Sequence, residues 1–392
     1  MSEGARGARN TDIPHPGFTI GNTNTPFFNG TYLADAQDLV VVTVNYRVSV
    51  FGFPGGAGVT QNLGLRDQRL AVEWIRDNIA SFGGDAAKIT IAGQSSGGVA
   101  VDYWAYAYPS DPIAHGIIAP SGNAFSFGSN TKVVQESNWN TVVDTVNCSS
   151  TSTEDTMQCM RSVPWELLKS AAASIRPARS NSVLRGIPPF WPTPDNEVVF
   201  PAEEYLLLTQ NGSFAKIPVL LGNTHAEHGY YVVPIFANGV IPTQAQIDAF
   251  LLESFTCPSS YQAAGRSRHG VAAYAYRYFA EWDNLKLYPG SGAYHGVDMH
   301  DVFGDSEDVT GLPPSVNQKK MTRLMQRVWF AFADDPARGL EREMGWPRFD
   351  ARKKTLALLG VENVPEARFA YPSVYDAPCS TVTMGALGTP AR

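Results

Sequence analysis

Three stretches of the chain are apolar without the regular polar alternation of a surface strand. Residues 39–46 are rich in valine, and residues 217–221 and 272–279 carry similar apolar or aromatic runs. Such runs are typical of strands that are covered on both faces, as in a mainly parallel sheet with helices on each side. A fourth stretch, Lys88–Ile91, also reads as a short strand. The pattern therefore predicts at least four strands of a central sheet.

Two longer stretches have the spacing of amphipathic helices. Residues 67–82 are predicted to form an amphipathic helix, because residues recur there at helical intervals: Leu70, Trp74 (with Ala71 and Ile75), Asn78 and Phe82. Residues 319–333 form a second predicted helix. Strands that alternate with helices favour a doubly wound α/β fold. No linker divides the chain, so we expect a single α/β domain over all 392 residues.

Composition and charge exclude several classes of function. The chain has 44% hydrophobic and 17% charged residues, as expected for a globular protein with a sizeable core. Its net charge of −7 provides no basic surface for nucleic acid or for an anionic membrane. No apolar run has the length of a membrane-spanning helix, and the first ten residues lack the apolar segment of a signal peptide.

The most informative stretch is Gly93–Gly97, which reads Gly-Gln-Ser-Ser-Gly and follows the predicted strand at Lys88–Ile91. A G-x-S-x-G sequence between a strand and a helix predicts a nucleophile elbow, a sharp turn that exposes the central serine. Glycines flank the serine because neighbouring backbone comes too close for a Cβ atom. Ser95 is therefore the candidate nucleophile. Ser96, which follows it, is expected to offer its backbone amide to an oxyanion.

A serine nucleophile needs an imidazole to take its proton and a carboxylate to orient that imidazole. In hydrolases with a nucleophile elbow, these residues follow in the order Ser, Asp or Glu, and His. Two regions fit this order, and both come just after a predicted strand. Residues 222–229 contain Glu227, and residues 292–304 contain His295. Open α/β sheets place their sites at this end of the strands.

The same two regions contain other residue types that bind metals in some proteins. These residues are His225, His228, Asp298, His300 and Asp301. Their spacing matches neither H-E-x-x-H nor a comparable helical pattern. Histidines beside a catalytic acid are more often hydrogen-bonded loop residues, so we expect neither a metal nor an organic cofactor. Ser121 is either a support for the site or an ordinary loop serine.

Further motifs extend the elbow pattern along the chain. Asn62-x-Gly64-x-x-Asp67-Gln68-Arg69 and Phe82-Gly-Gly-Asp85 precede it, and Gly222-x4-Glu227-x-Gly229 and Ala293-Tyr-His295-Gly296 follow it. Together these motifs resemble the type-B carboxylesterase and lipase family, which includes the cholinesterases and secreted fungal lipases. The resemblance extends from Gly17 to about Cys379. It implies an α/β-hydrolase fold and the hydrolysis of carboxylic esters through an acyl-enzyme.

The resemblance also implies roles for individual residues. Ser95 is the nucleophile, His295 the general base and Glu227 the acid that orients it. Arg47 and Asp67 match a structural ion pair of the family and have no catalytic role.

The cysteines and sequons indicate an oxidising compartment. The family carries disulfides at similar positions, which implies the pairs Cys148–Cys159 and Cys257–Cys379 and leaves none of the four cysteines free. The alternative is that the four cysteines are reduced and buried. Three N-glycosylation sequons are present, at Asn29, Asn147 and Asn211. We therefore expect a secreted protein, from the resemblance and not from a signal peptide.

The oxyanion loop departs from the family pattern. Where the family has consecutive glycines, this chain has His15-Pro16-Gly17-Phe18. Proline has no backbone N–H, so Pro16 cannot donate a hydrogen bond. The expected oxyanion hole is therefore made by the amides of Gly17 and Ser96.

The N-terminal region is expected to be incomplete. Family members carry a long segment before the oxyanion loop, including the first strands of the sheet, so the chain resembles an N-terminally truncated member. The strand that leads into the loop should lie between the strands at residues 39–46 and 88–91. Residues 10–14 are a poor strand sequence, so we expect this position to be empty. The two neighbouring strands would then have unpaired edges and promote aggregation.

Together, these observations predict a serine carboxylic-ester hydrolase that acts on a small-molecule or lipid ester. Gln94 precedes the nucleophile where cholinesterases have Glu, which disfavours a choline ester. Two contrasting hypotheses are a catalytically impaired fragment and a non-enzymatic binding protein of the same fold, because the family includes adhesion proteins. The presence of all three triad residues favours the enzyme. The oligomeric state stays open.

Overall fold

The computed structural model describes residues 7–12, 17–128, 131–177 and 182–384. Its centre is one eight-stranded sheet with the strand order β2-β1-β3-β4-β5-β6-β7-β8. All neighbouring strands are parallel except β7 and β8, which are antiparallel. The strands are β1 Gly7–Asp12, β2 Leu39–Thr43, β3 Gly84–Ala92, β4 Gly116–Pro120, β5 Val219–Thr224, β6 Ala273–Tyr278, β7 Leu356–Leu359 and β8 Ala367–Ala370. The expected mainly parallel α/β sheet is confirmed.

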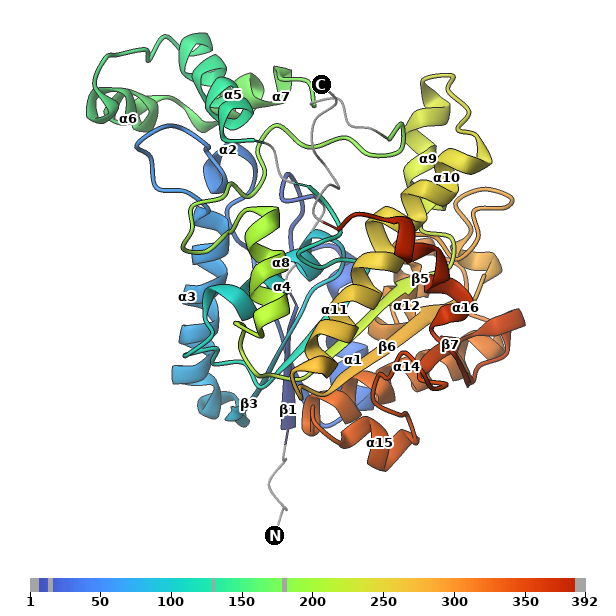
Figure 1. The fold of residues 1–392 in the computed structure, drawn as a ribbon. Coiled ribbons are helices and arrows are strands. Elements are labelled where there is room, and N and C mark those ends of the chain that lie inside the picture. Colours follow the sequence, from blue (N-terminus) through green and yellow to red (C-terminus); the bar gives the residue numbers. More distant parts are fainter. Residues whose placement is uncertain (1–6, 13–16, 129–130, 178–181, 385–392) are drawn as a thin grey trace.

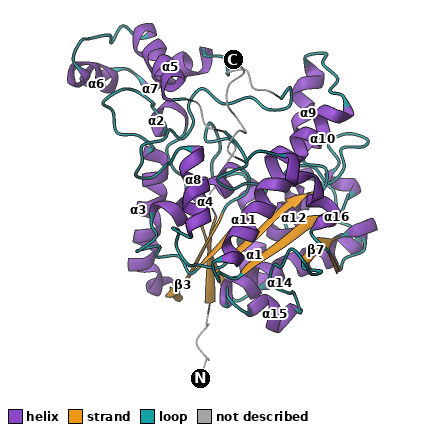
Figure 2. Ribbon diagram, viewed as in Figure 1, coloured by secondary structure: helices purple, strands orange, loops and turns teal. Residues whose placement is uncertain are grey.

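Helices enclose this sheet (Figure 2). They are α1 Thr31–Ala36, α2 Ser49–Gly52, α3 Leu63–Asn78, α4 Ser96–Ala107, α5 Lys132–Thr145, α6 Thr153–Ser162, α7 Trp165–Ser174, α8 Ala202–Asn211, α9 His228–Ala237, α10 Gln244–Leu251, α11 Cys257–Arg268, α12 Val297–Phe303, α13 Ser306–Thr310, α14 Val316–Asp334, α15 Gly339–Met344 and α16 Ser373–Asp376. Two groups, α5–α7 and α9–α10, stand at the end of the sheet opposite the start of β1 (Figure 1). No helix in the described part of the chain is long and apolar enough to cross a membrane.

The central strands are buried on both faces. In β5, Leu220 packs into a core cluster that includes Trp329 of α14, whereas Val219 and Leu221 pack into a second cluster with Val101 of α4. Alternate residues of a strand point to opposite faces, so a strand between two helical layers needs apolar residues at every position. This double coverage explains the apolar run that predicted the strand.

The predicted helix near residue 70 is confirmed as α3, but only part of the apolar pattern that predicted it is buried. Leu70 and Trp74 are 65% and 52% exposed, whereas Val72 and Ile75 are buried. Phe82, in the short 3-10 turn after α3, is also exposed. Two apolar stripes run along this segment at helical spacing. The aliphatic stripe packs against the sheet, where branched side chains fill the space between the layers.

The position between β2 and β3 is filled, which corrects the expectation that its strand is missing. Strand β1 pairs in parallel with both neighbours, and Asn10 lies opposite Val41 and Thr90. Ladder hydrogen bonds are made by backbone N–H and C=O groups, which residues of any type except proline provide. A segment of low strand propensity therefore becomes a strand when it has a partner on each side. The unpaired edges expected here do not arise in the described structure.

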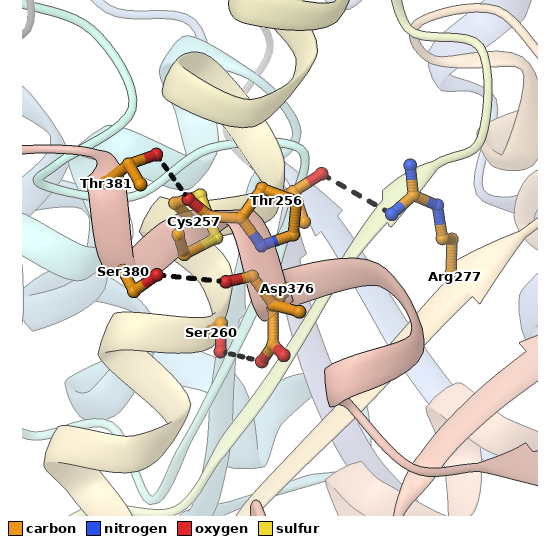
Figure 3. The surroundings of a disulfide bond; sticks show 10 residues. Thr256, Cys257, Ser260, Arg277, Asp376, Ser380 and Thr381 are labelled. Carbon is orange, nitrogen blue, oxygen red and sulfur yellow. Dashed lines mark hydrogen bonds between the residues drawn. A yellow bond between two sulfur atoms is a disulfide. The ribbon is translucent and has the colours of Figure 1, made fainter.

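Both expected disulfides are present. Cys148–Cys159 closes the loop between α5 and α6, and Cys257–Cys379 ties the C-terminal segment to the start of α11. Figure 3 shows the surroundings of the second bridge, where Ser260 Oγ donates to Asp376 Oδ2 at 2.5 Å. These contacts hold the described end of the chain against α11.

Candidate active site

The predicted elbow forms between β3 and α4. Ser95 has φ 60° and ψ −121°, a backbone conformation that non-glycine residues rarely adopt. Its amide donates to the carbonyl of Pro120 at the end of β4, at 2.9 Å. A Cβ atom on Gly93 would lie 2.4 Å from the carbonyl carbon of Gly97, so the turn requires glycine there. The strained turn presents the Ser95 side chain at the carboxyl end of the sheet.

The structure brings the other two predicted residues together. Glu227 lies between the end of β5 and the start of α9, and His295 lies just before α12. The distance from His295 Nδ1 to Glu227 Oε2 is 2.5 Å, although the two residues are 68 positions apart. The Glu227 side chain is fully buried. An ionised carboxylate only accepts hydrogen bonds, so Nδ1 carries the hydrogen and Nε2 is the free base.

Two further donors hold the Glu227 carboxylate. The hydroxyl of Ser121 donates to Oε1 at 2.7 Å, and the backbone amide of Thr224 donates to the same oxygen at 2.8 Å. Ser121 follows β4 and is fully buried. Of the two interpretations that the sequence left open for Ser121, the structure supports the one in which it contacts the site. Each carboxylate oxygen thus has its own partners, which fixes the plane of the group.

The Nε2 side of His295 has two contacts that the sequence did not suggest. The side-chain amide nitrogen of Gln94 lies 3.2 Å from Nε2 of His295, and the hydroxyl of Tyr231 lies 3.3 Å from it. The Tyr231 hydroxyl also interacts with the Ser95 side chain, and burial raises the pKa of Tyr231 above its usual range. Among the described residues, no hydrogen bond joins Ser95 Oγ directly to His295. Tyr231 is one of two adjacent tyrosines in α9, and only its position in the fold reveals this contact.

Ser95 and His295 line one cavity of about 750 Å³. Most of its other walls are apolar or aromatic. They include Ile20, Phe27, Phe127, Ile187, Trp191, Tyr230, Ile235 and Leu287. A cavity of this size holds a molecule of several hundred daltons, and an apolar wall with few polar groups is typical of small-molecule sites.

Both predicted oxyanion donors, Gly17 and Ser96, also line this cavity. Neither amide donates to another described residue, so both are available to a ligand. Phe18 anchors the loop, because its ring is fully buried and packs edge-on against Trp191 at 4.9 Å. His15 and Pro16 lie outside the described residues. The hydroxyl of Ser96 is buried without a described partner, so the elbow presents the side chain of Ser95 instead.

The residues considered as metal ligands have other partners. His225 stacks on Phe279, and His228 is partly buried near the charges of Asp248 and Glu227. Asp298 accepts a hydrogen bond from Tyr276, and Asp301 accepts from Tyr278, Trp282 and Thr322. His300 pairs with Asp305. Within the described ranges, no three His, Cys, Asp or Glu side chains are grouped so that they could hold a metal ion. The predicted structural pair of Arg47 and Asp67 is present, with Nη2 and Oδ1 2.7 Å apart.

Comparison with known proteins identifies this arrangement. A model of the carboxylesterase family matches residues 13–251. The chain belongs to the carboxylesterase family. The carboxylesterase resemblance, the α/β-hydrolase fold and the class of carboxylic ester hydrolase are thereby confirmed at the level of the family.

The relatives include fungal and bacterial proteins. The chain is 33% identical to secreted lipase 5 of Gibberella zeae over 383 residues, which cover 92% of this chain and 69% of the relative. It is 32% identical to the chlorogenic acid esterase of Aspergillus niger over 368 residues, 92% of this chain and 66% of the relative. Identity to the para-nitrobenzyl esterase of Bacillus subtilis is 26% over 398 residues, 89% of this chain and 76% of the relative. The chain thus spans about two thirds of the length of the two fungal relatives.

Proposed function

We propose that this chain is a serine hydrolase that cleaves carboxylic esters through an acyl-enzyme. Ser95 is the nucleophile, His295 the general base and Glu227 the acid that orients the imidazole. The observation that supports this proposal best is the convergence of the three residues. The elbow serine and an imidazole bonded to a buried carboxylate line the same cavity.

The reaction has two half-steps. Ser95 Oγ attacks the ester carbonyl carbon while its proton moves to His295 Nε2, and the carbonyl oxygen becomes an oxyanion. The oxyanion is stabilised by the amides of Ser96 and Gly17. When the tetrahedral intermediate collapses, the carbon–oxygen bond to the alcohol breaks and the alcohol takes the proton from Nε2. Water then attacks the acyl-enzyme with the same base, which releases the acid and restores Ser95.

The resting geometry requires one adjustment. Because Gln94 and Tyr231 contact His295 Nε2, the Ser95 hydroxyl has to rotate towards that nitrogen when substrate binds. Hydrogen bonds of catalytic groups are often long or misaligned without substrate and tighten in the complex. The imidazole itself does not need to move, because its bond to Glu227 is already short.

The cavity suggests the kind of ester. Its apolar and aromatic walls favour a substrate with an apolar or aromatic group on the acyl or alcohol side, either a small molecule or a lipid. We propose that the protein acts in an oxidising, extracellular compartment. Two disulfides are formed, and the sequon residues Asn29, Asn147 and Asn211 are all exposed, as glycosylation requires.

Ser95→Ala tests the mechanism. We expect the wild-type chain to hydrolyse a short-chain p-nitrophenyl ester and to react covalently with an organophosphonate, and the variant to lose both properties. Removing one member of a catalytic triad typically lowers kcat by several orders of magnitude. Ser306→Ala, which changes a buried serine outside the cavity, is the matched control. If Ser95→Ala retains wild-type turnover, the mechanism is wrong. A folded wild-type chain with neither activity would favour the non-enzymatic binding protein.

A further inference from the structure

The cavity contains a second imidazole that the proposed mechanism does not use. His300 lies five residues after His295, in the middle of helix α12, and its side chain is 7% exposed. Its Nδ1 is 2.7 Å from Oδ1 of Asp305, whose side chain is fully buried. Of the histidines in the described chain, only His295 and His300 line this cavity.

One nitrogen of this second imidazole is open to the cavity. Nδ1 of His300 bonds to Asp305, whereas Nε2 has no hydrogen-bond partner among the described residues. Nε2 is also not among the fully buried atoms that lack a partner, so part of its surface is accessible. His300 lines the cavity, and Nε2 is the polar atom of its side chain that other described residues leave free for a ligand there.

The ring is held in place from two sides. Asp305 fixes Nδ1, and the ring of Phe27 packs edge-on against the imidazole with 4.8 Å between ring centres. The two carboxyl groups of α12 point into the core and not into the cavity. Asp298 and Asp301 accept hydrogen bonds from Tyr276 and Tyr278 in the core, and neither lines the cavity. His300 is therefore the polar residue of α12 that reaches the binding space.

We propose that His300 Nε2 binds a hydroxyl group of the substrate, so that the cavity selects esters with an alcohol or phenol hydroxyl on the part held near Phe27. This proposal rests on the proposed function and specifies its substrate class. When Nδ1 donates its hydrogen to Oδ1 of Asp305, Nε2 is an acceptor, which suits a hydroxyl donor. A fixed polar group in a mostly apolar cavity is the usual means of orienting a ligand.

The expected preference is modest but measurable. A hydrogen bond gained at this nitrogen is worth about 1 kcal/mol, which corresponds to about a fivefold preference for the hydroxylated ester over its parent. Methyl 3-phenylpropanoate and its three ring-hydroxylated isomers place a hydroxyl on the acyl side. Benzyl acetate and its hydroxylated isomers place it on the alcohol side. We expect at least one isomer to have a five- to tenfold higher kcat/KM than its parent.

His300→Asn is the principal variant. The asparagine amide occupies the position of Nδ1 and keeps the bond to Asp305, but nothing replaces Nε2. We expect the hydroxyl preference, the ratio of kcat/KM for the hydroxylated ester to kcat/KM for its parent, to fall below twofold. His300→Phe, which keeps the aromatic packing, is expected to give the same result if His300→Asn does not fold. His225→Phe is the matched control, because this histidine stacks on Phe279 and does not line the cavity.

Binding measurements separate this proposal from the proposed chemistry. In the Ser95→Ala background, dissociation constants of the same ester pairs are obtained without turnover. We expect the preferred isomer to bind about fivefold more tightly than its parent, and this difference to disappear with His300→Asn. Loss of the catalytic mechanism would leave that binding ratio intact. The proposal is overturned if no hydroxylated ester is preferred, or if the folded His300 variants retain the wild-type preference.

Discussion

Ser121→Ala tests whether the Ser121 hydroxyl orients the carboxylate of Glu227. The substitution removes one hydroxyl and keeps the Cβ atom and the backbone. Among the described residues, this hydroxyl bonds only to Oε1 of Glu227, at 2.7 Å, in a fully buried environment. Oε1 would keep the amide of Thr224, and Oε2 would keep His295. The variant thus weakens the orientation of the carboxylate without removing its charge.

The expected losses of stability and of kcat follow from this single hydrogen bond. A hydrogen bond to a charged group is worth about 1.5–3 kcal/mol, and the retained Thr224 amide places the expected loss of folding stability near 2 kcal/mol. If the same free energy is lost from the transition state, where the imidazolium next to Glu227 develops its charge, kcat falls by up to about 30-fold. We expect a decrease of about 5- to 30-fold in kcat with little change in KM, since Ser121 does not line the cavity.

The assay compares two serines of the same loop. Ser126 is also fully buried, but its hydroxyl accepts from the backbone amide of Asn123 at 3.0 Å, and in the described structure it has no hydrogen bond to Glu227. Urea denaturation measures stability, and steady-state hydrolysis of a p-nitrophenyl ester measures kcat. Both alanine variants are expected to lose about 1–2 kcal/mol of stability, whereas only Ser121→Ala lowers kcat. Equal kcat values for the two variants would refute the orienting role of Ser121.

Two other predictions concern stability. Burial, and then the charge of Glu227, raises the pKa of Asp298 to about 7. The folded state therefore binds the proton more tightly than the unfolded state. The stability that this proton contributes is lost as pH rises through about 7. Between pH 5 and pH 8, the free energy of unfolding of Asp298→Asn is therefore expected to rise by about 2–4 kcal/mol relative to that of the wild type. If urea denaturation gave the same difference between the two proteins at both pH values, the prediction would be wrong. Replacing Cys257 and Cys379 by serine should lower the folding stability by about 4–5 kcal/mol. Replacing Cys148 and Cys159 should lower it by about 3 kcal/mol, because the loop that this pair closes is shorter. Equal midpoints of the two variants in thermal unfolding would reject this ranking.

Much of the site could be predicted because its signals are local. The turn around Ser95 requires glycine at fixed neighbouring positions, and that requirement is visible in five consecutive residues. Glu227 and His295 could be proposed because each follows a strand that is itself recognisable from its apolar run. The contact between them is a different matter: it depends on β5 and β6 being neighbours in the sheet, which the strand order decides.

Other features could not be read from the sequence because tertiary packing chose between alternatives. The segment containing α3 has apolar residues on more than one face. Only the assembled sheet decided that Ile75 is buried, while Leu70 and Trp74 stay exposed. Residues 7–12 have weak strand propensity, but a gap between two parallel strands imposes extended backbone on the segment that enters it. Propensity is worth fractions of a kcal/mol per residue, whereas leaving backbone groups unpaired costs about 1–3 kcal/mol each.

The sequence by itself therefore predicted several of the strands and helices, the α/β class, a candidate nucleophile and the order of its candidate partners. Only the tertiary structure decided which side chains surround them: Ser121 on the carboxylate, Tyr231 and Gln94 on the imidazole, and His300 in the wall of the same cavity. The physical reason is one of range. Turns and strands are set by sterics and hydrogen bonds between near neighbours in the chain, whereas the lining of a cavity depends on where helices far apart in sequence come to rest against one sheet.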